Sequence, residues 1–449
     1  MIDACSQEQL PLESLKQFIN SYYLTNRTIA SSDIAKILDA AEELVRLPLK
    51  RHRFRTGEEH GTWIVPPLWD IKDAWLKDSD GNLIASYKDH PLFVSPYSMP
   101  IRTVLSKDEL RPHVFSDPAQ PDAFLYNWRY AMDARLRLKD WSISLPERSV
   151  QKLGPGPFEV CIEADVTDGD MLVGEITLEG EREDTLLFLA DYCHPGQVND
   201  SFSGLAVLLK VMHDLSKLGR RQYTYKLLIL PETIGSTVYI ASDPARLKTL
   251  RGAVFVDTVA WGENWFLKST RDANTYMDLL TNECLRAFPM VSKKDFFNPY
   301  GNDEMIFDSV QANVPSLSLH KYPFAEYHSS LDEPSRINDA DLALACRVLM
   351  HMVDVIEKDR TYRFTHTVPF WMSRFDLFAD DVYNPVEFER NFNIVYRYLD
   401  GQTSTLKIAD MLNLPFEGVH SYIAKMAAYD LVRDQRAATF QGQSQERSL

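Results

Sequence analysis

The chain has 449 residues, of which 45% are hydrophobic and 25% charged, a balance typical of a globular protein with two or three domains. Its formal net charge of −16 argues against a nucleic-acid partner, because a strongly acidic protein repels phosphate groups. The five cysteines are an odd number at wide spacing, which fits neither a disulfide framework nor a zinc-binding cysteine pair.

No targeting or membrane segment is apparent in the sequence. The N-terminus has no basic patch followed by an apolar core, so it does not predict a signal peptide. No apolar run approaches the roughly 20 residues that a membrane span needs. We therefore expect a cytoplasmic protein with no membrane partner.

The N-terminal residues 8–48 predict two amphipathic helices. Leu15, Phe18 and Ile19 share one face of the first helix, and Ile34 and Ile37 share one face of the second. No chemistry is evident in these helices, so we expect them to cover one side of the core.

Residues 61–174 have a different texture, with short alternating segments separated by turn residues, and they predict an inserted β-rich domain. Aromatic residues are dense there, and two interpretations are open. They form the core of a small β domain, which is the favoured one, or they line a substrate wall. These aromatics are Trp63, Trp69, Trp75, Tyr97, Tyr126, Trp128, Tyr130 and Trp141.

Strands and helices alternate from residue 175 to residue 365. Buried strands are predicted at 186–191, 226–230, 253–257 and 316–320, with helices at 202–218, 243–250, 274–288 and 339–358. This alternation predicts the α/β class, with a mostly parallel or mixed sheet covered by helices. Residues 1–60 and 175–365 then form one α/β domain, interrupted by the β-rich insertion.

The C-terminal part predicts a small separate domain after a linker at 365–384. Its order of helix, short helix, longer helix and hairpin over 385–437 is that of a winged helix-turn-helix. The candidate recognition helix, in the stretch 415–431, carries one lysine against one glutamate and one aspartate, so packing against the α/β domain or a dimer partner is favoured over DNA binding. Residues 438–449 are polar and predict a disordered tail.

Candidate metal ligands follow the predicted strands where each strand ends. His194 and Asp200 follow the first strand, Glu232 the second and Asp257 the third, while His328 lies eight residues beyond the fourth. Carboxyl ends of parallel strands meet at one sheet edge, where ligands bind. Two imidazoles with carboxylates and an open position are typical of catalytic zinc, and a free carboxylate serves as general base. We interpret the other histidines as structural or solvated: His52, His60, His90, His113, His213, His320, His351, His366 and His420.

Four segments resemble the motifs of the M28-type zinc aminopeptidases. They are FLADYCHPGQVNDSFSGLAVLL, PETIGS, NDEMIFDSVQANVPSLSL and EYHSSLDEP, in that order. The layout with an inserted β domain and a C-terminal winged helix is similar to an aminopeptidase-like family known only as domains of unknown function. The resemblance covers residues from about 15 to about 435, and it implies a zinc aminopeptidase-like fold.

The resemblance implies roles for individual residues. His194, Asp200 and His328 match metal ligands, and Glu232 matches either the general base or a ligand. Thr233 stands where the peptidases have a second glutamate, so the sequence favours one zinc ion over two, with Glu232 as base.

Three further acidic residues match the family less closely. Asp303 and Glu304 occupy the place of an Asp-His pair, where either one binds a substrate amine or supplies the base. Asp257 falls near the position of a further ligand, although the residues after it differ from the family pattern.

The leading hypothesis is a metal-dependent hydrolase that cleaves an amide or peptide bond, with a small peptide or a biosynthetic intermediate as substrate. Two alternatives stay open: a single-zinc acyltransferase or cyclase of the glutaminyl-cyclase type, and a non-enzymatic winged-helix regulator with a structural metal. A homo-oligomer is compatible with each of them.

Overall fold

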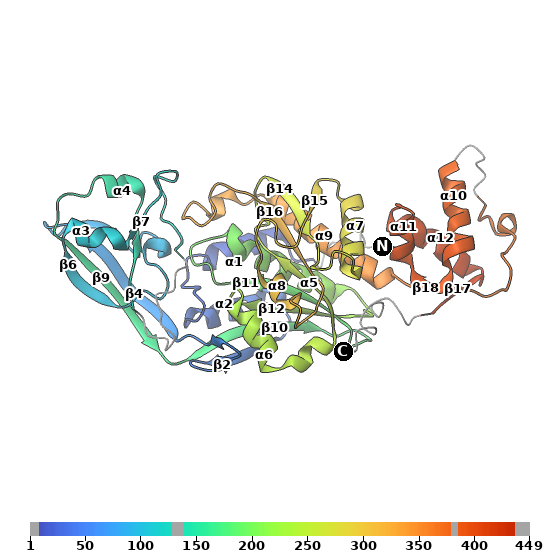
Figure 1. Ribbon diagram of the computed structural model, residues 1–449, viewed down its shortest axis with the longest axis horizontal. Helices are drawn as coiled ribbons and strands as arrows, with labels where there is room; N and C mark the ends of the chain where they lie inside the picture. The colour runs from blue at the N-terminus through green and yellow to red at the C-terminus, as the bar shows by residue number, and fades with distance from the viewer. Residues whose placement is uncertain (1–8, 128–138, 379–384, 436–449) are drawn as a thin grey trace.

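The computed structural model describes residues 9–127, 139–378 and 385–435. A central α/β body carries a β-rich lobe at one end and a C-terminal module at the other, which gives an elongated molecule (Figure 1). The predicted disordered tail at 438–449, Trp128 and Tyr130 lie outside the described residues. Among the described residues, no helix combines the length and apolar character that crossing a bilayer requires.

One eight-stranded mixed sheet forms the centre of the body. Its spatial order is β1 (Leu49–Arg55), β10 (Asp170–Leu178), β12 (Thr224–Leu230), β11 (Thr185–Asp191), β13 (Leu250–Val256), β16 (Ser316–Tyr322), β14 (Asn264–Lys268) and β15 (Val291–Lys294). The four strands from β12 to β16 are parallel, as predicted. The antiparallel neighbours β10 and β14 flank them.

Helices and the lobe cover the two faces of this sheet. One hydrophobic cluster joins it to α1 (Leu12–Tyr22), α2 (Asp33–Val45), α5 (Gly204–Lys217), α7 (Tyr276–Ala287) and α9 (Asp339–Lys358). A second cluster joins the other face to α6 (Ile234–Ser242), α8 (Asp303–Phe307) and the lobe. The central strand β11 is buried along its whole length, which explains its unbroken apolar sequence.

The prediction of a helix at 243–250 is wrong. The helix α6 instead begins at Ile234 and ends at Ser242, and Pro244–Lys248 forms a short 3-10 turn. The sequence IGSTVYIAS contains β-branched and aromatic residues of low intrinsic helix propensity. Burial of Ile234, Val238 and Tyr239 against the sheet overrides that propensity.

The β-rich lobe is built around a four-stranded antiparallel sheet. Its spatial order is β5 (Leu83–Ser86), β4 (Leu68–Lys77), β9 (Phe158–Thr167) and β6 (Ile101–Leu105). The lobe also holds β7 (Val114–Phe115), β8 (Ile143–Ser144), α3 (Lys107–Leu110) and α4 (Glu147–Gln151). A short hairpin of β2 (Glu59–His60) and β3 (Trp63–Ile64) lies against α6 of the body (Figure 1). Trp69, Tyr97 and Trp141 are buried core residues, as the favoured interpretation expects, whereas Trp63 is exposed.

The C-terminal module follows α9 directly. It contains β17 (Thr361–Phe364), α10 (Pro385–Asn393), β18 (Asp400–Ser404), α11 (Thr405–Met411), α12 (Phe416–Ala428) and β19 (Val432–Asp434). It packs on α7, where Asp410 pairs with Arg286 at 3.1 Å and accepts a hydrogen bond from Asn282 at 3.0 Å. The backbone N–H of Phe416 donates to Glu283 at 3.1 Å. The module therefore rests on the body through its second and third helices.

Candidate metal centre

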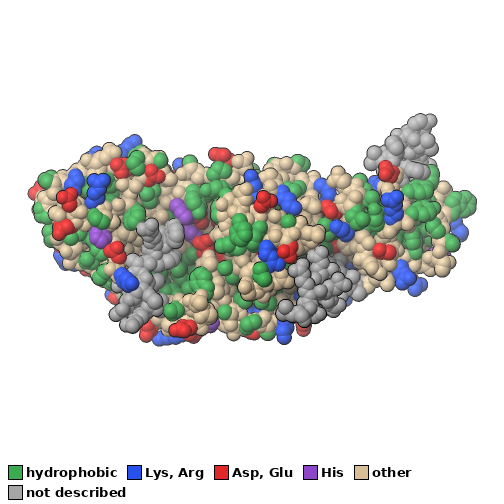
Figure 2. All heavy atoms as spheres, in the orientation of Figure 1, with side chains coloured by type: hydrophobic (Ala, Val, Ile, Leu, Met, Phe, Trp, Pro, Cys, Tyr) green, Lys and Arg blue, Asp and Glu red, His purple; other side chains and the backbone are tan. Residues whose placement is uncertain are grey.

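The candidate centre lies at the edge of the sheet where the parallel strands end. β11 ends at Asp191, and a loop then carries His194 to a π-helical turn, Asn199–Ser203, that contains Asp200 and leads into α5. Glu232 follows β12, and His328 lies in the loop after β16. Histidine and acidic side chains reach the surface where the lobe adjoins the body (Figure 2).

The structure brings the three predicted ligands and the predicted base together. His328 Nε2 lies 3.0 Å from Asp200 Oδ2, and His194 Nε2 lies 3.8 Å from Asp200 Oδ1. Ligand atoms of these three residues all lie within 4.8 Å of one another. Tetrahedral zinc holds its nitrogen and oxygen ligands about 3.4 Å apart, so this donor set and spacing fit a zinc ion. Glu232 Oε2 lies 3.6 Å from His194 Nε2, on the same cluster.

Burial sets the charge state of these groups. It lowers the pKa of His194 to about 4, so the imidazole is neutral near pH 7 and offers a free lone pair. Burial alone raises the pKa of Asp200, but His194 and His328 outweigh it and lower that pKa overall. Burial, followed by the nearby carboxylates of Asp303 and Asp200, raises the pKa of Glu232 to about 8.

The loop that carries His194 and Asp200 is held from behind by two residues that sequence reasoning missed. The Asp332 carboxylate accepts backbone hydrogen bonds from Val198 at 3.0 Å, Asn199 at 2.7 Å and Asp200 at 3.1 Å. The Arg27 guanidinium, which is completely buried, donates to the carbonyls of Tyr192, His194 and Gln197. For Asp332, the only sequence signal of its role was its position four residues after the predicted ligand His328.

Asp303 and Glu304 do not join the ligand cluster. Asp303 accepts a hydrogen bond from the backbone N–H of Thr233 at 3.0 Å, and it therefore supports the residue next to Glu232. Glu304 forms a fully buried ion pair with Lys268. Directly before them in the chain, the Asn302 side-chain amide faces Glu232 and donates to its carboxylate when its nitrogen points that way.

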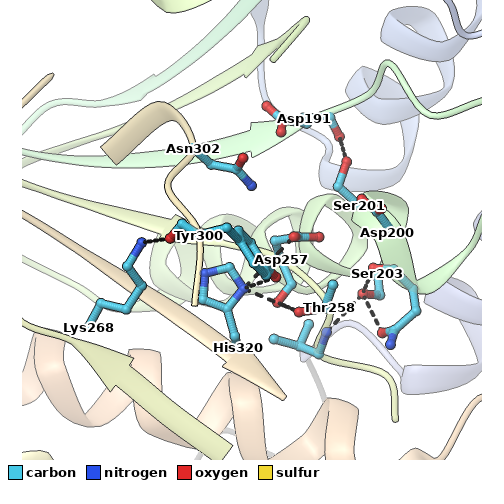
Figure 3. Close-up of polar contacts among 12 residues, drawn as sticks. Asp191, Asp200, Ser201, Ser203, Asp257, Thr258, Lys268, Tyr300, Asn302 and His320 are labelled. Carbon is cyan, nitrogen blue, oxygen red and sulfur yellow. Dashed lines mark hydrogen bonds and ion pairs between the residues drawn. The ribbon is translucent and has the colours of Figure 1, made fainter. Parts of the chain in front are cut away.

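A second polar group lies beside the ligand cluster, around Asp257 (Figure 3). His320 Nδ1 is 3.8 Å from Asp257 Oδ2, 3.2 Å from Thr258 Oγ1 and 3.3 Å from the Tyr300 hydroxyl. Asp257 is not within ligand distance of the His194 group among the described residues, although it lies close enough for the charges of Asp200 and Glu232, after burial, to raise its pKa.

Three loop residues at this edge have left-handed backbone conformations. Thr233 has a φ of 64°, Thr258 of 53° and His328 of 56°. Such conformations cost about 1–3 kcal/mol in residues other than glycine and persist only where the surroundings enforce them. Thr233 follows Glu232, Thr258 follows Asp257, and His328 is itself the third predicted ligand, so the backbone is most constrained where the polar groups converge.

Comparison with known proteins identifies the family. Residues 16–359 match the family described as Domain of unknown function (DUF4910). The chain belongs to this family. A Clostridium acetobutylicum relative is 30% identical to this DUF4910 protein over 75% of this chain and 76% of its own, and its name provisionally describes a polysaccharide biosynthesis protein with an aminopeptidase-like domain.

Solved structures agree with the fold of this DUF4910 protein. A crystal structure from Clostridium acetobutylicum, provisionally named as a peptidase, is 26% identical, with a TM-score of 0.82 over 94% of this chain and 96% of its own. A zinc aminopeptidase from Bacillus subtilis is 13% identical, with a TM-score of 0.56 over 77% of this chain and 95% of its own. The zinc aminopeptidase-like fold implied by the motifs is therefore confirmed.

Proposed function

We propose that this protein is a metal-dependent hydrolase of an amide or peptide bond, with one zinc ion held by His194, Asp200 and His328. The convergence of these three side chains at the sheet edge carries the proposal, since their ligand atoms lie within 4.8 Å of one another. The aminopeptidase-like domain in the name of the Clostridium acetobutylicum relative supports the same reaction class.

Glu232 is the general base in this proposal. A bound zinc ion supplies a Lewis acid that polarises a carbonyl group and lowers the pKa of water. Glu232 takes up a proton from the attacking water and returns it to the leaving nitrogen. Burial, followed by the charges of Asp303 and Asp200, gives Glu232 a higher proton affinity than an ordinary glutamate, which is the direction that a general base needs. Asn302 and Asp303 orient the carboxylate and the peptide that carries it.

The substrate class follows from the charge around the centre. Asp200, Glu232 and Asp257 lie around it, and a protonated amine next to the scissile amide would offset the mutual repulsion that, after burial, raises the pKa of Glu232 and Asp257. A small peptide or an aminoacyl amide fits this requirement. An N-acylated biosynthetic intermediate is a second candidate, because its acyl group is also joined to nitrogen by an amide bond. This candidate agrees with the name of the Clostridium acetobutylicum relative.

Metal content and amide hydrolysis together test the proposal. We expect purified wild-type protein to carry about one zinc ion per chain and His194→Ala to carry much less. Wild-type protein is expected to cleave an aminoacyl chromogenic amide, and Glu232→Gln to retain zinc while its turnover falls by about 10²–10⁴-fold. Zinc binding without turnover on any amide would count against the hydrolase and in favour of a structural metal.

A further inference from the structure

The lobe reaches the metal centre through one short segment. The backbone N–H of Tyr126 donates to the carbonyl of His328 at 2.8 Å, and the N–H of Ser330 donates to the carbonyl of Phe124 at 2.8 Å. Leu125 and Ser329 form an antiparallel bridge between these bonds. A strip of the lobe thus pairs with the loop that carries the third predicted ligand.

This pairing acts on a strained residue. His328 has a φ of 56°, a conformation that a non-glycine residue keeps only when its neighbours hold it. The bond from Tyr126 fixes the carbonyl of His328 itself, and the Ser330 side chain adds a further bond from the N–H of Phe124 at 3.0 Å. The lobe is therefore part of what holds His328 in its left-handed conformation.

The Tyr126 side chain contacts both predicted histidine ligands. Its ring centroid lies 5.1 Å from that of His194 and 5.2 Å from that of His328, while the two imidazoles are 5.9 Å apart. The ring is 7% exposed, and the hydroxyl donates to the carbonyl of Cys193 at 3.5 Å. A rigid aromatic ring that touches both imidazoles restricts their rotation.

We propose that Tyr126 is a positioning residue, which fixes the ring orientations of His194 and His328 and thereby couples the lobe to metal affinity at the site. This inference rests on the proposed function only in taking the two histidines as zinc ligands. Residues behind metal ligands commonly change metal affinity by about 10- to 100-fold when they are removed. The centre is then complete only when the lobe is docked on the body.

The test compares four proteins: wild type, Tyr126→Phe, Tyr126→Leu and Tyr97→Leu. Tyr97 is a matched control, because it is a buried tyrosine of the same lobe whose hydroxyl donates to the carbonyl of Pro67 at 3.0 Å and whose ring packs against Trp69. Zinc affinity is measured by competition with a chelating dye, and the thermal unfolding midpoint is measured on the metal-free proteins.

We expect Tyr126→Leu to weaken zinc binding by about 10- to 100-fold, and Tyr126→Phe, which keeps the ring, to stay within about threefold of wild type. Tyr97→Leu should lower the unfolding midpoint but leave zinc affinity unchanged. Wild-type zinc affinity in Tyr126→Leu would overturn the proposal, and so would an equal loss of affinity in Tyr97→Leu.

Ser330→Ala gives an independent arm if Tyr126→Leu does not fold. It removes only the side-chain acceptor of the Phe124 N–H, so we expect a folded protein with a smaller loss of zinc affinity. Unchanged affinity there would contradict the proposal. The two proposals can fail separately. If substitution of Tyr126 weakens zinc binding but the wild-type protein hydrolyses no amide, only the proposed hydrolase activity is refuted. If the wild-type protein hydrolyses amides but substitution of Tyr126 leaves zinc affinity unchanged, only the positioning role of Tyr126 is refuted.

Discussion

Asp332 accepts three backbone hydrogen bonds and is completely buried, although it is not itself a predicted metal ligand. Asp332→Ala leaves the buried N–H groups of Val198, Asn199 and Asp200 without an acceptor, at about 1–3 kcal/mol for each such group. We expect zinc affinity to fall by about 10- to 100-fold, because the loop that presents Asp200 loses its support. Competition with a chelating dye measures the change.

Asp278→Ala is the matched control for Asp332→Ala. Asp278 is also a buried carboxylate that accepts two backbone hydrogen bonds, from Thr270 at 3.1 Å and Thr275 at 2.9 Å, but it caps α7 outside the centre. Its loss should reduce the free energy of unfolding and leave zinc affinity intact. Equal losses of affinity in the two variants would show that Asp332 acts only through global stability.

We expect Glu175, on β10, to make a pH-dependent contribution to the stability of the folded protein. Burial alone raises its pKa, but hydrogen bonds from His52 at 2.9 Å and Tyr239 at 2.7 Å, with Lys226 at 3.2 Å, outweigh burial and lower that pKa overall. A lowered pKa in the folded state gives stability that is fully present above the unfolded value of about 4.3 and is lost as pH falls towards the folded value.

Urea denaturation of wild type and Glu175→Gln measures that contribution. We expect Glu175→Gln to cost about 1–3 kcal/mol at pH 7, because Lys226 and His52 lose a charged acceptor. The difference between the two proteins should shrink at pH 4. Glu163→Gln, which changes an exposed carboxylate on β9, should have little effect at either pH. A difference that grows as pH falls would contradict the assigned direction of the shift.

The placement of His194, Asp200, Glu232 and His328 could be predicted because each follows a strand, and parallel strands bring their carboxyl ends to one edge. Their roles as ligands and base remain predictions. Arg27 could not be found in this way, because it binds carbonyl groups about 165–170 residues away, and no local pattern records such partners.

At the scale of elements, the contact between α5 and β13 positions the turn that contains Asp200. A Cβ atom on Gly204, the first residue of α5, would lie 1.9 Å from the carbonyl oxygen of Val256. Gly204→Ala must therefore push the helix away from the strand end, at about 1–3 kcal/mol. We expect a lower unfolding midpoint together with weaker zinc binding, measured by thermal denaturation and dye competition.

Gly219→Ala is the control near the opposite end of α5. A Cβ atom there has nothing within 4 Å, so the change should be neutral or slightly stabilising. Wild-type zinc affinity in Gly204→Ala would mean that the turn holds Asp200 in place without close packing of the helix.

Predictions of elements succeeded where burial gives an unambiguous pattern. The four parallel strands read as apolar runs because both of their faces are covered. The edge strand β1 was missed, because only Leu49, His52 and Phe54 among its residues are buried and the others are basic or polar. A half-buried edge strand with this composition resembles a loop until its pairing with β10 is known.

At the scale of the whole molecule, the net charge of the chain and the packing of the C-terminal module on the body bear on the hypothesis that the protein is a winged-helix regulator. On α12, Glu417 pairs with Lys358 at 3.2 Å, and Lys425 pairs with Asp376 at 3.1 Å. Phe416, Val419 and Ile423 of this helix are buried. Among its described residues, the helix has no cluster of lysine and arginine that could bind phosphate groups. With a formal charge of −16, the chain as a whole repels DNA.

We therefore expect no specific binding to duplex DNA, measured by fluorescence anisotropy at about 50 and 200 mM salt. Asp376→Ala offers a sensitive comparison, because it frees Lys425 from its ion pair and raises the local positive charge. If α12 contacted phosphate groups, this variant would bind DNA more tightly than wild type at low salt and lose that gain at high salt. Tight, salt-sensitive binding by the wild type itself would favour the regulator, and it would require the module to bind DNA while Asp410 stays paired with Arg286 on α7.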